Sequence, residues 1–531
     1  MVDSLILTID IGTQSVRVAL FDASGNVVGL EKKAYSPAYF SPQPNFAEQD
    51  PNYYFACLKE CTKALSESHP NEMKLVKGIT MSCFRDSAVL LDENNEVVRP
   101  TILWLDQRMA ECKEKLPLLS RMLFRLVGKT DAIVFNRRRS VSNWLKENEP
   151  ENWARVKKYM PLSTYLNFLL TGNLLDSASN MSGHFPINFK KRQWYDKPEK
   201  NLTGQIFSVT RDMLPTLIKE GDPIGAIREE LAAEVGLPAG TLLYACGSDK
   251  SCETLGLGVI SPTQAAISYG TASTVETTKT TYSDSEPFLP AFSSCIPGYY
   301  NMDIQIYRGY WMINWFLSEF AGKKIHDLVT AEISLDDLDK NLTSVPPGSD
   351  GLILQPYWGP GLARPTARGA IVGWSDASTR EHFYRAIIEG IAYALREGLE
   401  HFEKKNRQSI NDVRVCGGGA QSDIVCQITA DIMGKPVTRV QTIETGSLGA
   451  AIAGFLAIGV YQNAEEAIRA MVHSKVVFEP NPETHQIYDY YFYDCYLKLY
   501  PSLKDVYTSI KTQNEKETKR LYALRRAQNK Q

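Results

Sequence analysis

Hydrophobic and polar positions alternate at the start of the chain. Residues 5–10 and 16–22 form two β-rich runs, and a polar segment with a glycine separates them. A Ser-Gly-Asn turn at residues 24–26 precedes a third run at residues 27–30. Runs of this kind, bounded by turn residues, are typical of strands. The pattern predicts a β-meander whose first two strands are joined by a short hairpin.

Helical spacing of apolar residues appears next. Residues 51–68 place Tyr54, Cys57, Leu58, Cys61 and Leu65 on one face, which predicts a helix. A strand pair is predicted within residues 75–92. Further helices are predicted over much of residues 100–180 and at residues 381–402, 424–433 and 445–451.

The strand–turn–strand pattern recurs about halfway along the chain. Strands are predicted at residues 265–269 and 274–278, and the segment between them reads Gly-Thr-x-Ser, as do residues 12–15. Each hairpin alone could be a simple turn. Two of them, each near the start of a half-chain, indicate a duplicated architecture. Two like domains could then hold one polyphosphate with two hairpins.

Length and charge narrow the class of protein. The chain has 531 residues, which indicates two large domains or a few small ones. The formal net charge of -3 gives no electrostatic reason to expect nucleic acid as a partner. The basic triplet Arg137-Arg138-Arg139 is short, as on an ordinary solvated surface.

Targeting and metal signals are not visible in the sequence. The chain enters a strand within a few residues, and no apolar run reaches the length of a membrane span. The ten cysteines form no CxxC pair, and we interpret Cys57 and Cys61 as packing residues. Reduced thiols, a cytoplasmic location and no membrane association are expected. The dispersed histidines give no reason to expect a protein-ligated transition metal.

Glycine-rich turns are the candidate phosphate sites, because no side chain blocks the approach of phosphate to backbone N–H groups. The Walker loop is absent: Gly128-Lys129-Thr130 has its end, but Leu123 stands where its first glycine would be. The protein-kinase motifs are also absent. Any nucleotide site must be of another type.

The order of motifs resembles that of the FGGY family of carbohydrate kinases, from about residue 5 to about residue 475. The segments that carry the resemblance are Asp10-Ile11-Gly12-Thr13-Gln14-Ser15-Val16-Arg17, Ala47-Glu48-Gln49-Asp50-Pro51, Gly247-Ser248-Asp249, Tyr269-Gly270-Thr271, residues 367–373 with 385–390, and residues 416–422. This order is more specific than any single motif.

The resemblance implies an α/β fold with two actin-like ATPase (ribonuclease H-like) domains facing a central cleft. Residues 1–255 would form the N-terminal domain with the sugar site, residues 256–475 the C-terminal domain with the adenosine site, and residues 476–531 a helical extension or frayed tail. The implied activity is ATP-dependent phosphorylation of a hydroxyl of a small sugar or polyol, such as xylulose, ribulose, glycerol or erythritol. A homodimer is possible in such families.

The resemblance also assigns roles to residues. Asp249 would be the general base, with capping of the helix at residues 251–255 as the structural alternative. Asp10 would bind Mg²⁺–ATP, unless it is an ordinary aspartate at a strand end. The residues expected to bind nucleotide are Gly12, Thr13, Gln14, Ser15, Arg17, Gly270, Thr271, Gly309, Gly418, Gly419 and Ser422.

Arg85 and Asp86 stand where the family binds its substrate, and a buried salt bridge is the alternative interpretation. Two departures from the family pattern concern the signatures: Val141 replaces a usual lysine, and Trp374 replaces an aliphatic residue. Because the first departure lies near the expected sugar site, one hypothesis is that the arginine triplet at residues 137–139 admits an acidic or unusual sugar.

Two other functions fit the same scaffold. A peptide-binding chaperone should carry a further β-rich domain after the ATPase, and none is predicted here. A non-catalytic or regulatory nucleotide-binding protein could lack the reactive carboxylates, whereas Asp10 and Asp249 are both present. The sequence therefore favours a kinase.

Overall fold

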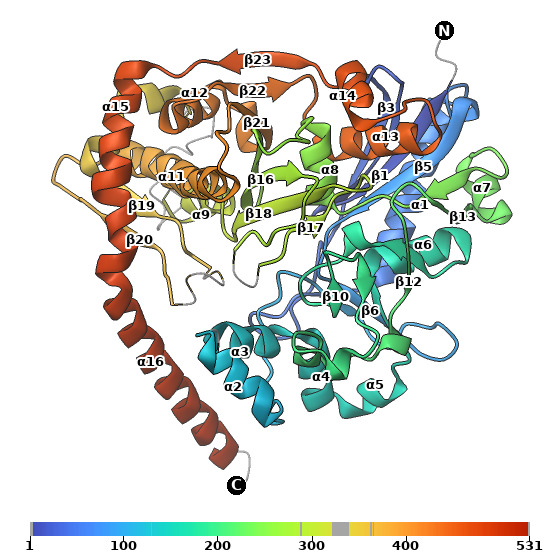
Figure 1. Ribbon diagram of the computed structural model, residues 1–531, viewed down its shortest axis with the longest axis horizontal. Coiled ribbons are helices and arrows are strands. Elements are labelled where there is room, and N and C mark those ends of the chain that lie inside the picture. Colours follow the sequence, from blue (N-terminus) through green and yellow to red (C-terminus); the bar gives the residue numbers. More distant parts are fainter. Residues whose placement is uncertain are drawn as a thin grey trace, which may run out of the picture. The chain divides into compact units, whose positions relative to one another are not determined.

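The structure, a computed structural model, describes residues 4–128, 130–286, 289–320, 339–359, 361, 364 and 366–528 (Figure 1). The chain forms two compact units. Unit 1 comprises Met1–Pro262, Thr277–Asp303 and Val440–Ser474, and unit 2 comprises Thr263–Glu276, Ile304–Arg439 and Lys475–Gln531. The boundaries expected after residues 255 and 475 stay a prediction.

A six-stranded sheet forms the centre of unit 1. Its order is β13-β14-β5-β1-β2-β3, with bounds Pro223–Ala226, Leu242–Tyr244, Val76–Cys83, Leu5–Ile11, Ser15–Phe21 and Val27–Ala34. Strand β1 runs antiparallel to β2 and parallel to β5, and β2 runs antiparallel to β3. The predicted meander and its hairpin are therefore confirmed. The register places Asp10 between Arg17 and Ser82.

Most strands of a seven-stranded sheet belong to unit 2. The order is β17-β18-β16-β15-β21-β22-β23, with bounds Phe292–Ser293, Tyr300–Ile306, Ser273–Lys279, Gln264–Tyr269, Asp412–Gly417, Val437–Val440 and Ser474–Phe478. Strand β15 runs antiparallel to β16 and parallel to β21, as β1 does with β2 and β5. This repetition of one topology confirms the duplication that the two hairpins predicted.

Helix α1 (Pro51–Ser68) has the predicted bounds. The Asp50 side chain accepts a hydrogen bond from the backbone N–H of Asn52 and caps the helix. Cys57 and Cys61 are buried on its inner face, which agrees with their interpretation as packing residues. The predicted helices at residues 381–402 and 424–433 correspond to α11 (Arg380–Asn406) and α12 (Asp423–Met433).

Shorter elements complete the fold. Further helices among the described residues are α2 (Leu118–Leu126), α3 (Thr130–Arg139), α4 (Val141–Asn148), α5 (Pro150–Arg155), α6 (Leu162–Thr171), α7 (Glu229–Val235), α9 (Trp311–Phe320) and α14 (Ala464–Met471). The remaining strands are β4 (Glu48–Gln49), β6 (Ala88–Leu91), β7 (Thr101–Ile102), β8 (Lys158–Pro161), β9 (Leu175–Ser177), β10 (Ile187–Asn188), β11 (Gln193–Trp194), β12 (Thr216–Ile218), β19 (Ile353–Gln355) and β20 (Ala370–Val372).

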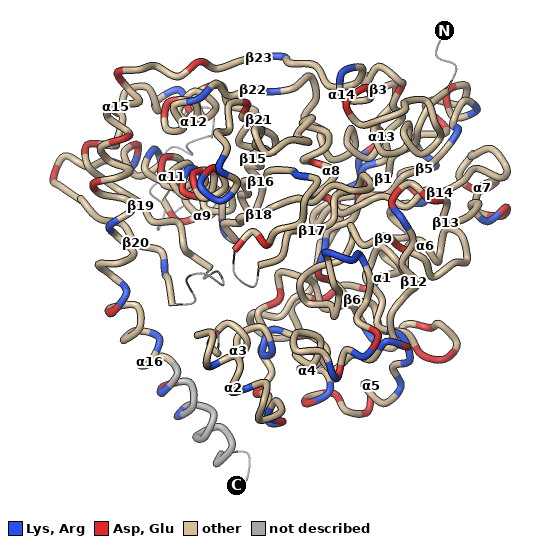
Figure 2. The backbone as a smooth tube through the Cα atoms, in the orientation of Figure 1, with Lys and Arg blue, Asp and Glu red and all other residues tan. Residues whose placement is uncertain are grey.

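The C-terminal segment is helical. Helix α15 (Pro482–Tyr490), a π-helical segment (Tyr491–Tyr496) and α16 (Leu497–Gln528) follow one another. Arg396 of α11 pairs with Asp489 of α15 at 2.5 Å. Basic and acidic residues are interspersed along the backbone (Figure 2). No helix among the described residues has the length and apolar character needed to cross a membrane.

Two helices of unit 1 pack with their backbones in contact. These are α8 (Asp249–Gly256) and α13 (Thr445–Ala457). A Cβ on Gly256 would lie 1.9 Å from the carbonyl oxygen of Thr445, and a Cβ on Gly449 would lie 1.8 Å from that of Cys252. Both distances are far below van der Waals contact, so each glycine is required for this approach.

Replacing Gly449 with alanine is expected to lower the free energy of unfolding by about 1–3 kcal/mol, because an added methyl overpacks the α8–α13 contact. Urea unfolding followed by circular dichroism measures the change. Gly183→Ala is the control, since no heavy atom lies within 4 Å of its added Cβ. Equal stability of the two variants would contradict the packing described.

Candidate functional site

Asp10 lies in a polar network near the end of β1. Its Oδ1 accepts a hydrogen bond from Ser82 Oγ at 2.6 Å, and its Oδ2 pairs with Arg17 Nη1 at 3.0 Å. Arg17 Nε also pairs with Glu444 Oε2 at 3.0 Å. Burial lowers the pKa of Arg17, but the two carboxylates outweigh it and hold the pKa above its ordinary value. Arg17 is therefore a fixed cation between two acids.

Hydrogen bonds within the turn, and from Trp104 and Tyr35, hold the hairpin between β1 and β2 in place. The Gly12 N–H donates to the Ser15 carbonyl at 3.0 Å, which closes the turn. The Trp104 indole N–H donates to Thr13 Oγ1 at 2.9 Å, and the Tyr35 N–H donates to the Gln14 carbonyl at 3.0 Å.

Asp249 occupies the first turn of α8. The helix is capped by Ser248, whose Oγ accepts from the Ser251 N–H, so the expected alternative role of capping falls to Ser248. Burial raises the pKa of Asp249 to about 6, and Glu253 also raises it, while Lys250 and Arg85 lower it. A carboxylate with this pKa is ionised at neutral pH and still basic enough to accept a proton.

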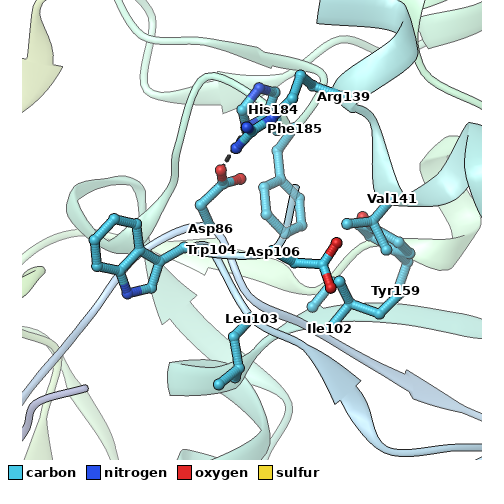
Figure 3. Close-up of a pocket in the computed structure, with 11 residues that line it drawn as sticks. Asp86, Ile102, Leu103, Trp104, Asp106, Arg139, Val141, Tyr159, His184 and Phe185 are labelled. Carbon is cyan, nitrogen blue, oxygen red and sulfur yellow. Dashed lines mark hydrogen bonds and ion pairs between the residues drawn. The ribbon is translucent and has the colours of Figure 1, made fainter. Parts of the chain in front are cut away.

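A small pocket in unit 1 is lined by Asp86 together with apolar, aromatic and charged side chains (Figure 3). Its lining comprises Asp86, Ala88, Ile102, Leu103, Trp104, Asp106, Arg139, Val141, Tyr159, His184 and Phe185. Figure 3 shows the Asp86 carboxylate pointing toward His184, with Arg139 on the same side of the pocket. The second acid, Asp106, pairs with Arg108 at 2.7 Å.

Asp86 is held in place by two neighbours. Its Oδ1 accepts from Ser182 Oγ at 2.9 Å, and its Oδ2 lies 2.5 Å from His184 Nδ1. Its backbone has a φ of 67°, in the left-handed region that few non-glycine residues adopt. Burial raises the pKa of Asp86, but His184 and Ser182 outweigh it, so the pKa lies below its usual range. Asp86 is thus an ionised hydrogen-bond acceptor that opens to the pocket.

Arg85 pairs with an acid other than Asp86. Its Nη2 pairs with Asp303 Oδ2 at 3.1 Å, and its guanidinium lies 4.2 Å from the centre of the Phe292 ring. The salt bridge considered as an alternative for Arg85 and Asp86 is therefore present, with Asp303 as the acid. Among the described residues, Asp303 Oδ1 is buried without a hydrogen-bond partner.

The three arginines at residues 137–139 make different contacts. Arg137 Nη2 donates to the Glu114 carbonyl at 2.7 Å, and Arg138 Nε donates to the Ala110 carbonyl at 3.3 Å. Arg139 lines the Asp86 pocket, as does Val141 at the departure from the family signature. The other departure, Trp374, is half-exposed and packs on Phe383.

In unit 2, the second hairpin lies against the segment before α9. The Tyr310 N–H donates to the Gly270 carbonyl at 3.1 Å, and the Trp311 N–H donates to the Thr271 carbonyl at 3.3 Å. A Cβ on Gly309 would lie 2.1 Å from Ser273 Oγ, so only glycine permits this approach.

The other residues of unit 2 that the sequence predicts to bind nucleotide come directly after β21 in the chain. Gly419 lies against the Tyr310 ring, and a Cβ there would be 2.4 Å from it. A Cβ on Gly418 would meet no heavy atom closer than 3.9 Å, which leaves space beside its backbone. Ser422 Oγ accepts from the Val425 N–H and caps α12.

Sequence reasoning missed several polar residues of the site. These are Ser82, Trp104, His184, Asp303 and Glu444. None belongs to a motif singled out in the sequence, and each contacts a candidate residue through the fold. The sequence signals that pointed toward the pocket were Asp86, the arginine triplet with Arg139, and the departure at Val141.

Replacing Asp249 with asparagine is expected to stabilise the fold at pH 7.5 by up to about 3 kcal/mol. The folded protein binds the Asp249 proton more tightly than the unfolded chain, so wild-type stability falls relative to the variant as pH rises from about 4 to 6. Urea unfolding at pH 4 and pH 7.5 measures the difference. The exposed Asp196→Asn is the control. A variant that is less stable than wild type at pH 7.5 would refute the burial of this charge.

Known protein families match this chain in two consecutive parts. The sequence matches the FGGY family of carbohydrate kinases, N-terminal domain, over residues 5–256 and the C-terminal domain of that family over residues 265–458. A xylulose kinase of Lactococcus lactis subsp. lactis is 31% identical over 509 residues, which cover 94% of this chain and 97% of the relative.

Two solved structures share the fold. The xylulose kinase of Lactobacillus acidophilus has a TM-score of 0.79 at 22% identity, covering 96% of this chain and 100% of its own. A gluconate kinase of the same organism has a TM-score of 0.78 at 22% identity, covering 96% of this chain and 100% of its own. The family matches confirm the expected family and enzyme class, and the solved structures confirm the expected fold class. The chain therefore belongs to the FGGY family of carbohydrate kinases and is a phosphotransferase that acts on a sugar.

Proposed function

We propose that this kinase transfers the γ-phosphoryl group of ATP to a hydroxyl of a ketose, with D-xylulose as the first candidate. The observation that carries the proposal is Asp249, a residue of intermediate burial whose carboxyl pKa is raised by burial, in the same unit as the Asp86 pocket. The name of the Lactococcus lactis relative, at 31% identity over nearly the whole chain, supports xylulose as the substrate to try first.

Asp249 is the proposed general base. The attacking hydroxyl oxygen forms a bond to the γ-phosphorus, the bond to the ADP oxygen breaks with its electron pair, and Asp249 accepts the hydroxyl proton. Helix α8 begins at Asp249, and Ser248 provides its cap, so the cap does not depend on the Asp249 carboxylate. Asp249 Oδ1 accepts a hydrogen bond from the Lys250 N–H at 2.8 Å. Its raised pKa suits a base that must be ionised near neutral pH.

The phosphates and adenosine of ATP are proposed to contact the two hairpins and the end of β21. The residues are Gly12, Thr13, Gln14, Ser15 and Arg17 of unit 1 and Gly270, Thr271, Gly309, Gly418, Gly419 and Ser422 of unit 2. The open space beside Gly418 supports a backbone contact there. Ser422 and Gly309 also have structural roles, which their substitution would disturb.

The residues near Asp10 fit a magnesium ion that arrives with the nucleotide. No group of three or more His, Cys, Asp or Glu side chains in the described part of the chain is arranged to hold a metal by itself. Magnesium is commonly held by one or two carboxylates together with substrate phosphates, which makes Asp10 a sufficient protein ligand. When bound, the ion neutralises charge on the phosphates.

The Asp86 pocket offers both kinds of partner that a sugar chain needs. Asp86 accepts hydrogen bonds from hydroxyls, whereas Arg139 can only donate them. The negative charge of Asp86 disfavours an acidic substrate. The positive charge of Arg139 keeps a sugar acid as the second candidate, in line with the hypothesis on the arginine triplet.

We expect D-xylulose to be phosphorylated in an ATP-dependent reaction when a panel of ketoses, polyols and sugar acids is assayed by ADP release. The Asp249→Asn variant should lose at least about 100-fold in kcat, since it lacks the base. Turnover of a sugar acid alone would favour the second candidate. Full activity of Asp249→Asn would contradict the proposed base.

Arg139→Ala is expected to raise the KM for the sugar about 10-fold, because it removes a charged hydrogen-bond donor from the pocket. Arg137→Ala is the matched control, since Arg137 donates to a backbone carbonyl outside the pocket lining. Steady-state kinetics with the best substrate measure both. Equal KM values for the two variants would remove Arg139 from substrate recognition.

A further inference from the structure

A buried segment that begins in β9 contacts both aspartates of the proposed site. It comprises residues 176–182, which we call the β9 extension, and it includes a 3₁₀ turn at Ala178–Asn180. All of these residues are buried, with exposed fractions of 6% or less. Because buried polar groups need hydrogen-bond partners inside the protein, the contacts of the extension indicate what it holds in place.

The β9 extension contacts the loop that precedes Asp249. Ser177 Oγ donates a hydrogen bond to the Cys246 carbonyl at 2.5 Å, and the Ser248 N–H donates to the Ser179 carbonyl at 3.3 Å. The loop packs closely on the extension, because a Cβ on its central glycine would lie 2.3 Å from Ser179 Oγ. Asp249 follows Ser248 directly, so these contacts fix the start of α8 and the proposed base.

Asp86 is held by the other end of the β9 extension. Ser182 Oγ donates to Asp86 Oδ1 at 2.9 Å. The Met181 N–H donates to the Ala178 carbonyl at 3.2 Å, which joins Ser182 to the 3₁₀ turn. One short stretch of chain therefore connects the proposed base with the proposed acceptor of the sugar hydroxyls.

Asp176 organises the β9 extension through four hydrogen bonds. Its Oδ1 accepts from the Ser177 N–H at 2.8 Å and from Asn180 Nδ2 at 2.7 Å, which folds the extension back on its own start. Its Oδ2 accepts from two residues of α6, Ser163 Oγ at 2.6 Å and Thr164 Oγ1 at 2.7 Å. Burial raises the pKa of Asp176, and these hydrogen bonds oppose the rise. The carboxylate thus ties the extension both to itself and to α6.

We propose that Asp176 is a positioning residue for phosphoryl transfer, which holds the loop of Asp249 through Ser177 and holds Asp86 through Ser182. The inference rests on the proposed roles of Asp249 and Asp86. Asp176 is fully buried, and its four hydrogen bonds are to groups of the protein, so it takes no part in the proton transfer itself. Its effect on the rate comes from geometry, since transfer slows steeply when the base or the hydroxyl is displaced.

A purely structural role is the alternative. Asp176 would then only join α6 to β9, and the end of β5 would position the site, because Cys83 forms a parallel bridge with Ser248 and Asp86 follows three residues later. In that case, loss of Asp176 would lower the stability of the fold and leave the kinetic constants unchanged. The kinetic constants of folded variants therefore separate the two roles.

Two serine variants test the two connections separately. Ser177→Ala is expected to lower kcat about 10-fold with the KM for the sugar changed less than about 2-fold, because it releases the loop of the base. Ser182→Ala is expected to raise this KM about 5-fold with kcat changed less than about 2-fold, because it removes a donor that orients Asp86. Steady-state kinetics of ADP release measure both variants. Wild-type constants in both would overturn the proposal.

Replacing Asp176 itself should combine the two effects. Asp176→Ala is expected to lower kcat at least about 10-fold and to raise KM about 5-fold. Asp176→Asn should restore both constants to within about 3-fold of wild type, since its amide oxygen can accept from Ser177 and Asn180 while its amide nitrogen donates to the two hydroxyls of α6. An Asp176→Asn variant as impaired as Asp176→Ala would overturn a role based on hydrogen-bond geometry.

Asn167→Ala is the matched control. Asn167 is a buried residue of α6, and its Nδ2 donates to the Leu175 carbonyl of β9 at 3.0 Å. The variant removes a hydrogen bond between the same two elements and leaves the β9 extension in place. It should lower the free energy of unfolding and keep the kcat and KM of wild type. Kinetic losses in this control as large as those of Asp176→Ala would overturn the proposal in favour of the structural role.

The outcomes also separate this inference from the proposed function. An inactive Asp249→Asn together with wild-type constants in the Ser177, Ser182 and Asp176 alanine variants would overturn the positioning role and leave the base intact. Full activity of Asp249→Asn would remove the proposed base, whatever the serine variants show. Thermal unfolding checks that each variant is folded at the assay temperature. If Asp176→Ala is not, the two serine variants carry the test.

Discussion

The backbone contact between α8 and α13 is the constraint on which the site in unit 1 depends. Gly256 and Gly449 let the two helices approach without side chains between them. Helix α13 then brings Glu444 to Arg17 and Gly446 to the side chains of Asp10 and Glu253. Packed backbones deform little, so the separation between the Asp10 network and the Asp249 turn is fixed. Reactions that depend on positioning lose rate steeply when reacting groups are misplaced by about 1 Å.

The surroundings of Asp86 and Asp249, two aspartates of unit 1, shift their pKa values in opposite directions. Burial raises the pKa of both, but His184 and Ser182 reverse the shift at Asp86 and leave it an ionised acceptor. At Asp249 burial prevails, although Lys250 and Arg85 oppose it. Carboxylates whose environments separate their pKa values commonly have separate chemical roles. Here the separation supports substrate binding by Asp86 and proton transfer by Asp249.

The sequence predicted the parts of the fold that depend on local pattern. Period-two runs gave β1, β2, β15 and β16, and helical spacing gave α1 with its bounds. The repeated Gly-Thr-x-Ser hairpin indicated the duplication because the same turn serves the same topology in both sheets. The motif order identified Asp10 and Asp249 as candidates, since each stands at the end of a strand or the start of a helix.

Contacts between distant segments were beyond the reach of these patterns. His184 meets Asp86 across 98 residues, and Trp104 meets Thr13 across 91. Glu444 pairs with Arg17 only because α13 returns to the first sheet. The separate directions of Arg137 and Arg139 also follow from the helix that carries them and not from their shared charge. Such pairings require the tertiary fold before they can be seen.

The most direct test of the central claim is a crystal structure of the enzyme with a non-hydrolysable ATP analogue, magnesium and the sugar that it turns over. The account predicts that one hydroxyl of the sugar lies about 2.6–3.2 Å from the Asp249 carboxylate and points at the γ-phosphorus. It also predicts that other hydroxyls of the sugar contact Asp86. A sugar bound away from Asp249, with another group within reach of its reacting hydroxyl, would contradict the account.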